Sequence, residues 1–188
     1  MPNTLCTTNA YIYDELSGKS IGNPASYCCG YIYDKGFCNV SFKEMHPEVV
    51  YIRSEEIHLN FPSQNLFSYI EQMTPQDVVL KSGNILDVNK KAGLLVGQPY
   101  GGEFGKIMPY ILSKGIQLIV PMTLNKTAPI VLDNILPELG VDVISREFCC
   151  GVSVGMLPLH GKVFTEIEAF DILVGVTAYP ISMSGVDS

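Results

Sequence analysis

The chain has 188 residues, of which 47% are hydrophobic and 16% charged, and its formal net charge is −7. This length suits a single domain with a sizeable core, and so low a charge content argues against disorder. Basic residues are thinly spread, and no run of them is longer than Lys90-Lys91. The sequence therefore lacks the basic face that nucleic acids and acidic membrane surfaces require.

No apolar run approaches the roughly 20 residues of a membrane-spanning helix, and the first eleven residues lack the charged and apolar regions of a secretory signal. We therefore expect a cytoplasmic protein with no membrane partner. The six cysteines include two adjacent pairs, at 28–29 and 149–150, and show no zinc-ligand spacing with the three histidines. We interpret them as small core residues in a reducing compartment. The sequence predicts no metal site and identifies no cofactor.

The first 75 residues predict a mixture of helices and antiparallel strands. A helix begins at Thr7 or Thr8, either of which suits its cap, and ends at Gly18. β-rich runs on both sides of residues 34–36 are typical of a hairpin. We expect the hairpin and the strand after it to form an antiparallel portion of the sheet. In chain order, these elements are a helix at residues 7–16, a hairpin at 26–40, a strand at 49–53 and a helix at 62–73.

From residue 77 onward, strands alternate with helices, which favours a mainly parallel sheet. Residues 116–120 are almost wholly apolar, as in a central strand covered on both faces. The T-x-x-E sequence at Thr165 is a capping box, and Gly175 ends that helix. We thus predict one α/β domain over residues 1–188, a three-layer, Rossmann-like sheet with a small antiparallel portion. The predicted strands are 77–80, 92–96, 116–120, 141–144, 148–154 and 176–182, and the predicted helices are 102–113, 127–139 and 165–175.

Two glycine-containing loops follow predicted strands, at residues 81–84 and 101–103. Ligands of open α/β sheets bind beyond the carboxyl ends of the strands, and a glycine loop that opens a helix presents backbone N–H groups to an anion. Lys81 would neutralise a phosphate, although a turn with a solvated lysine is an equal alternative. The second loop fits close packing equally well. Glu103 would repel a phosphate there and favour a sugar hydroxyl or a cationic group.

Five segments resemble a poorly characterised group of conserved bacterial and archaeal proteins: TTNAYIYDEL, DVVLKSGNILD, AGLLVGQPYGGEFG, LIVPMTLNK and GKVFTEIEAFDILVGVTA. The group is similar to the superfamily of ribose-5-phosphate isomerase, glucosamine-6-phosphate deaminase and CoA transferases. The resemblance implies an α/β fold in which the loops at 7–9 and 81–84 contact a phosphate or carboxylate. The chain departs from the group at Cys6, where the group has glycine, and at Glu103, where it has threonine. It also lacks the glutamate motif of the transferases and the paired acids of the isomerase.

We therefore expect a protein that binds a small phosphorylated or carboxylated metabolite at the strand ends; the sequence identifies no reaction. Glu166 and Glu168 are interpreted as helix-start residues rather than an acid/base pair, and His160 as a surface-loop residue. The alternative is a non-enzymatic sensor or assembly subunit that forms a homo-oligomer through the hairpin. A redox role for the cysteine pairs is a third interpretation. The candidate ligand-binding residues are Thr7, Thr8, Asn9, Lys81, Ser82, Gly83, Asn84, Gly101, Gly102 and Glu103.

Overall fold

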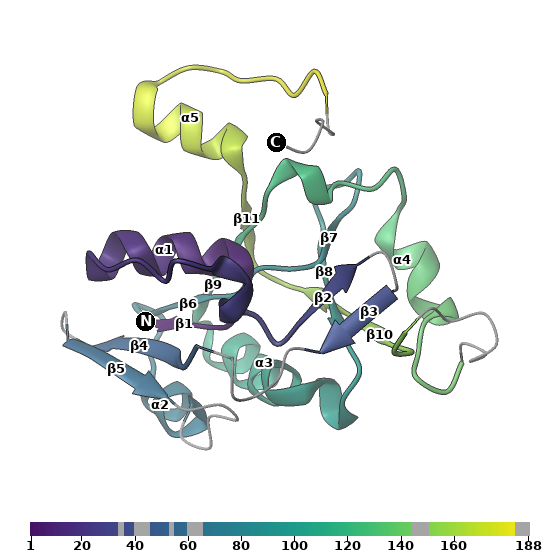
Figure 1. The fold of residues 1–188 in the computed structure, drawn as a ribbon, viewed down its shortest axis with the longest axis horizontal. Coiled ribbons are helices and arrows are strands. Elements are labelled where there is room, and N and C mark those ends of the chain that lie inside the picture. Colours follow the sequence, from purple (N-terminus) through teal and green to yellow (C-terminus); the bar gives the residue numbers. More distant parts are fainter. Residues whose placement is uncertain (34–35, 40–45, 53–54, 60–65, 144–150, 183–188) are drawn as a thin grey trace.

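The structure is a computed structural model that describes residues 1–33, 36–39, 46–52, 55–59, 66–143 and 151–182. Within these residues the chain forms a mixed α/β fold with a mostly parallel six-stranded sheet, a smaller antiparallel sheet and five α-helices. Figure 1 shows α1 above the strands of the main sheet, and α2 and α3 below them.

The main sheet has the strand order β11-β9-β6-β1-β4-β5. Neighbouring strands among β11, β9, β6 and β1 run parallel, whereas β4 and β5 add an antiparallel edge. The expected central strand at 116–120 is confirmed, since β9 pairs in parallel with both β6 and β11. The strands are β1 (Pro2–Asn3), β4 (Glu48–Ile52), β5 (Glu55–Leu59), β6 (Val78–Leu80), β9 (Gln117–Pro121) and β11 (Lys162–Phe164).

A second, antiparallel sheet consists of β7 (Ile85–Leu86), β8 (Ala92–Val96) and β10 (Gly155–Leu159) in the order β10-β8-β7. The strand expected at 92–96 is therefore correct, but its place in a parallel sheet is not. Five residues separate β7 from β8, which is too short for the crossover that parallel strands need. The expected hairpin is present as β2 (Gly30–Tyr33) and β3 (Gly36–Asn39), and residues 34–35 between them lie outside the described part. Its expected place in the main sheet is wrong, because β2 and β3 form a two-stranded sheet of their own.

The helices are α1 (Thr7–Ser17), α2 (Leu66–Gln72), α3 (Gly102–Lys114), α4 (Leu132–Ile135) and α5 (Glu166–Val174). Short 3-10 turns lie at η1 (Pro24–Tyr27), η2 (Pro99–Gly101), η3 (Leu124–Lys126) and η4 (Leu136–Glu138). The main core packs α2 and α3 against β6 and β9, with Ile70, Ile107, Ile111 and Val120 almost fully buried. A smaller cluster around Leu5, Ala10 and Tyr27 anchors α1. Burial of these apolar faces supplies the main driving force for the fold.

Two of the predicted helices start or end differently from expectation. α1 begins after Cys6, so the expected cap at Thr7 or Thr8 is wrong, whereas its end at Gly18, in the left-handed conformation, is as expected. Of the helix predicted at 127–139, only the single turn of α4 is α-helical. Pro137 follows it without a backbone N–H, and the chain continues as the 3-10 turn η4. α3, in contrast, continues through Pro109.

Three predicted strands near the C-terminus are corrected. Residues 141–143 form a turn, and residues 152–154 precede the actual strand β10; residues 144 and 148–150 lie outside the described part. Residues 176–182 form no strand, although they are apolar. A β-rich sequence becomes a strand only where a partner strand lies beside it, and none of the described strands does so here.

Candidate functional site

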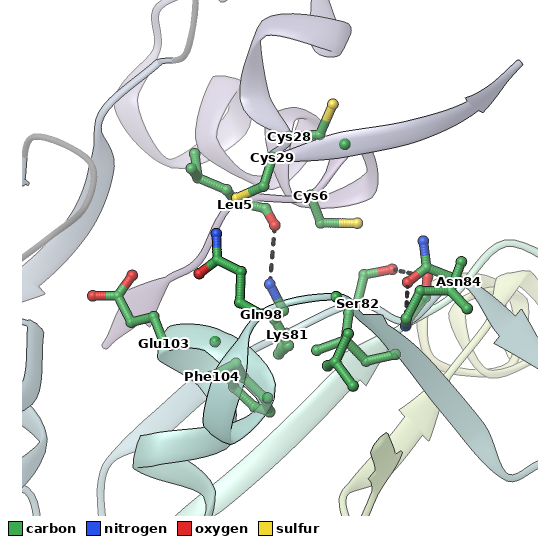
Figure 2. A pocket seen from close by; sticks show the side chains of 18 of the residues that line it. Leu5, Cys6, Cys28, Cys29, Lys81, Ser82, Asn84, Gln98, Glu103 and Phe104 are labelled. Atoms are coloured by element: carbon green, nitrogen blue, oxygen red, sulfur yellow. Dashed lines mark hydrogen bonds between the residues drawn. The ribbon is translucent and has the colours of Figure 1, made fainter. Parts of the chain in front are cut away.

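A cavity of about 400 Å³ lies where the start of α1, the loop after β6, the loop before α3 and the end of η3 meet. Figure 2 shows Cys6 and Ser82 together on one side of it, Glu103 on the other, and Lys81 between them. Such a volume suits a small metabolite. Its lining includes Leu5, Cys6, Thr7, Cys28, Cys29, Lys81, Ser82, Gly83, Asn84, Leu94, Leu95, Val96, Gln98, Gly101, Gly102, Glu103, Phe104 and Lys126.

The three loops singled out in the sequence converge on this cavity. Of the ten candidate residues, eight line it: Thr7, Lys81, Ser82, Gly83, Asn84, Gly101, Gly102 and Glu103. Thr8 lies just behind the wall and accepts a hydrogen bond from Ser82 at 3.5 Å. Asn9 is fully buried, and its side-chain amide donates to the carbonyls of Thr4 and Leu80. Asn9 therefore ties α1 to β6, away from the cavity.

Lys81 directly follows β6, and only 8% of it is exposed. Its Nζ donates to the Leu5 carbonyl at 3.1 Å and lies 5.5 Å from the centre of the Phe104 ring. The Leu5 N–H in turn donates to the buried carboxylate of Glu48. The backbone N–H and C=O of Leu5 are therefore both hydrogen-bonded. These bonds fix the backbone just before α1 and hold the Lys81 ammonium at the cavity wall.

Lys126 supplies a second ammonium group to the same cavity. Its Nζ donates to the Gly83 carbonyl at 2.9 Å and to the Ser82 hydroxyl at 3.4 Å. In the part of the chain that the structure describes, neither Lys81 nor Lys126 forms an ion pair. Because a partly desolvated ammonium gains stability from an opposite charge, the two lysines make the cavity attractive to an anion.

Cys6 is the cap residue of α1 and lines the cavity, and its side chain makes no capping hydrogen bond. Burial raises the pKa of the Cys6 thiol, while the charge of Lys126 lowers it. The Ser82 hydroxyl, the Lys81 ammonium and the Thr8 N–H lower it further, and the resulting pKa lies below the ordinary value of a cysteine. Cationic neighbours and a helix N-terminus are the environment in which thiols ionise readily.

The other two described cysteines of the cavity behave differently. Burial, followed by the nearby Cys6, raises the pKa of Cys28. Burial also raises the pKa of Cys29 to about 11, and the charge of Lys81 only partly offsets it. Of the three thiols, only Cys6 has a lowered pKa, while the pKa values of its two neighbours are raised.

The glycines of the two loops have structural reasons of their own. A Cβ on Gly83 would lie 2.7 Å from the carbonyl oxygen of Gly93, so the close approach of the loop to β8 requires glycine. Tyr100, Gly101 and Gly102 all have positive φ, and Gly101 is the cap of α3. Only glycine adopts this conformation readily, so the pair builds the sharp entry into α3. Close packing therefore explains Gly83, whereas Gly101 and Gly102 are explained by their backbone conformation, since an added Cβ would meet no atom closer than 3.7 Å. The alternative of a solvated lysine at 81–84 is wrong, because Lys81 is buried.

Sequence reasoning missed Cys6 and Lys126 as cavity residues. Cys6 appeared only as a departure from the resembled group, and Lys126 as the last residue of a matching segment. The sequence signal for Lys126 was its position five residues beyond β9, because β9 and β6 are adjacent parallel strands whose carboxyl ends lie together. His160 is exposed and lies outside this cavity, at a second hollow near Lys90 and Lys162.

Comparisons with protein-family models, with curated proteins and with solved structures found no match to this chain. Among the described residues, no helix has the length and apolar character that crossing a membrane requires. Within the same residues, no group of three or more histidine, cysteine or acidic side chains is placed to hold a metal ion.

Proposed function

We propose that the protein binds a small phosphorylated or carboxylated metabolite in the cavity between α1, the loop after β6 and the start of α3. The supporting observation is that the ammonium groups of Lys81 and Lys126 line this cavity without an ion pair in the described residues. Charge-assisted hydrogen bonds from two lysines, together with the N-terminus of α1, would hold the anionic group.

The other side of the cavity sets a second requirement on the ligand. Gln98 and Glu103 lie there, separated from Cys6 by Lys81. A carboxylate repels a second anion and accepts hydrogen bonds from hydroxyl or amino groups. The metabolite would therefore carry its anion near Lys81 and Lys126 and a hydroxyl or amino group at the opposite end.

The three-layer architecture of the isomerase and CoA transferase superfamily is part of the same proposal. Its support is a block of four parallel strands, β1, β6, β9 and β11, with α1 on one side and α2 and α3 on the other. The leading strand β1 has only two residues. The resemblance supplies no reaction, because fold alone does not define chemistry.

Thermal unfolding against inorganic phosphate, sugar phosphates, CoA esters, nucleotides and small carboxylic acids tests the binding proposal. A ligand at about 100 times its dissociation constant stabilises by about 2.7 kcal/mol, which corresponds to a shift of roughly 5–10 °C for a chain of this size. We expect the shift in one class of anion, and we expect it to be lost in Lys81→Met. Lys106→Met is the matched control, because Lys106 is exposed and outside the cavity. Equal shifts in both variants would contradict the proposal.

A second candidate function, assembly into a homo-oligomer, is favoured by α5. This helix has no buried residue and stands apart from the main body in Figure 1. A helix of nine residues is marginal on its own, and an exposed apolar patch of this kind marks a contact surface. We propose that a second copy of this chain covers it. The exposed apolar residues are Phe170, Ile172, Leu173, Val174, Val176, Tyr179 and Ile181.

Size-exclusion chromatography with light scattering tests the assembly. We expect an oligomer that Leu173→Glu converts to monomer, whereas Ser113→Glu, which adds the same charge on the exposed side of α3, leaves it intact. A wild-type chain that is monomeric at all concentrations would contradict it. A contact through the hairpin at 27–40 stays a prediction.

A further inference from the structure

Among the three described thiols of the cavity, Cys6 is the one on which both Lys126 and Lys81 act. It is the cap residue of α1 and lines the same cavity as the two lysines. Figure 2 shows its sulfur directed toward the side of the cavity that holds Ser82 and Asn84. A reactive cysteine needs such a partly accessible, electropositive position, whereas a structural one is buried among apolar groups.

A second observation, independent of the thiol, points to a ligand beside it. Lys81 is more than nine-tenths buried, and only the Leu5 carbonyl accepts a hydrogen bond from its ammonium within the described residues. An ammonium carries three donors, so this bond leaves two of them for a further acceptor, and the Phe104 ring lies 5.5 Å away. Burying a cation without an opposite charge is costly. An anionic group bound beside Lys81 would offset this cost, and it would lie in the same cavity as Cys6.

We propose that Cys6 is a nucleophile that adds reversibly to the carbonyl carbon of a small substrate carrying a carboxylate or phosphate. This inference rests on the proposed function, since Lys81 and Lys126 would bind the anionic group and thereby place the carbonyl against the sulfur. The chemistry needs no further reactant, because addition of a thiol to a carbonyl neither oxidises nor reduces either partner.

In the addition step, a lone pair of the Cys6 thiolate forms the new carbon–sulfur bond. The π electrons of the C=O bond move to the oxygen, which becomes an alkoxide. The Lys126 ammonium lies next to the Ser82 hydroxyl and donates a proton to that alkoxide, and the neutral amine then regains a proton from water. The product is a hemithioacetal, and the proton first lost by the thiol ends, in net terms, on the former carbonyl oxygen.

Alkylation with two matched reagents tests the nucleophile. Iodoacetate and iodoacetamide both transfer a carbon to the thiolate and release iodide, but only iodoacetate is an anion. With the full chain in its native state, peptide mapping by mass spectrometry follows each cysteine separately. We expect Cys6 to react at least about tenfold faster than Cys28 and Cys29 with iodoacetate. We also expect its ratio of iodoacetate to iodoacetamide rates to exceed that of glutathione, because two ammonium groups attract the anionic reagent.

The lysine variants separate attraction of the anion from simple exposure of the thiol. Lys126→Met is expected to bring the rate ratio at Cys6 down to that of glutathione, Lys126→Arg to keep most of it, and Lys106→Met to leave it unchanged. Circular dichroism and thermal unfolding establish that each variant is folded. A native Cys6 that reacts no faster than Cys28 and Cys29 would overturn the nucleophile, whatever the lysine variants do.

Glyoxylate tests the carbonyl addition itself, because it combines a carboxylate with an aldehyde. We expect it to protect Cys6 from iodoacetamide at a concentration at least about tenfold lower than acetate, which has the carboxylate alone. Equal protection by glyoxylate and acetate would overturn the proposed addition of Cys6 to a carbonyl. If phosphate binds in Lys81-dependent fashion but Cys6 is unreactive, this inference fails and the proposed function stands. If Cys6 is reactive but no anion protects it or binds, the proposed function fails and the substrate assignment fails with it.

Discussion

The N-termini of α1 and α5 differ in whether side chains cap their first backbone N–H groups. Each helix begins with backbone N–H groups that have no partner inside the helix. At α5, the Thr165 side chain accepts from the Ile167 N–H, and the Glu168 carboxylate accepts from the Thr165 N–H at 2.8 Å. At α1, the cap residue is Cys6, no side chain caps the N–H groups, and the first turn contains no acidic residue.

This difference is why we propose an anion site at the start of α1 and none at the start of α5. The capping box of α5 satisfies its donors internally, and its two glutamates already neutralise the helix dipole. The start of α1 has no acidic residue in its first turn and lies at the cavity, where Lys81 and Lys126 add positive charge. A bound anion would balance the dipole at the start of α1, whereas Glu166 and Glu168 already do so at the start of α5.

The largest expected effect comes from giving α1 the kind of cap that α5 has. Cys6→Asp places a carboxylate at the α1 N-terminus, where it takes up the free N–H groups and repels an anion in the cavity. We expect the dissociation constant of inorganic phosphate, measured by titration calorimetry, to rise by at least about tenfold. Thermal unfolding should show equal or greater stability, by about 0.5–1 kcal/mol, because aspartate is a strong cap. Cys6→Asn, which caps without charge, should lose less affinity, and an equal loss would contradict the electrostatic argument.

Removing the cap of α5 is the converse change. Thr165→Ala deletes the hydroxyl that accepts from Ile167, at a cost of about 1 kcal/mol. Because α5 buries no residue, the loss should appear as local opening rather than global unfolding. Hydrogen exchange of the α5 amides is expected to speed up by roughly fivefold, with phosphate affinity unchanged. Thr165→Ser retains the hydroxyl and should retain the protection; a change in phosphate affinity would show that the two helix starts are coupled.

The pH response of α5 is expected at the acid end of the scale. Burial raises the pKa of Glu168, but the bonds from Lys90 and Thr165 outweigh it and lower the pKa to about 2 from its ordinary 4.5. A carboxyl whose folded pKa is depressed stabilises fully above its unfolded pKa and loses that contribution as pH falls. The capping box should therefore weaken between about pH 4.5 and 2. A 13C NMR titration of the Glu168 carboxyl measures it, and Lys90→Met should raise the midpoint; an ordinary midpoint in the wild type would contradict the bonded geometry.

The smallest effect is expected at a third helix start, that of α3. Tyr100 has a φ of 60° just before the two glycines, and its side chain is largely exposed. The left-handed conformation costs a non-glycine residue about 1–2 kcal/mol, and glycine loses about 0.5–1 kcal/mol in entropy. Tyr100→Gly should thus stabilise by about 0.5 kcal/mol, a rise in melting temperature of roughly 1–2 °C. Tyr100→Ala keeps the strained backbone and should not raise the melting temperature. A rise in this variant would show that the tyrosine side chain, and not the backbone conformation, causes the strain.

The α5 start shows what local sequence predicts well. Thr165, Glu168 and Gly175 lie within eleven residues of one another, and the capping box and the left-handed end they predict are both present. The central strand β9 was equally predictable, because a strand covered on both faces must be apolar throughout. Each of these elements depends on interactions within its own segment or on burial alone.

The α1 start shows where such reasoning fails. Thr7 and Thr8 are good capping residues, yet the helix begins one residue earlier, at a position fixed by the bonds from the Leu5 peptide to Glu48 and Lys81. These partners are 43 and 76 residues away along the chain. The strand predicted at 176–182 failed for the related reason that a strand needs a partner whose position no local pattern encodes.

Local patterns were enough to predict the α/β class, the central parallel strand, the end of α1 and the capping box of α5. They also identified three glycine- or threonine-containing loops as candidate contacts. The folded chain was needed to show that these loops line one cavity, that Asn9 lies outside it, and that Lys126 and Cys6 belong to it. The physical reason is how far apart along the chain the interacting residues lie. Helix caps and apolar periodicity are local properties of the chain, whereas the environment of a lysine or a thiol depends on side chains that meet only when the sheet has formed.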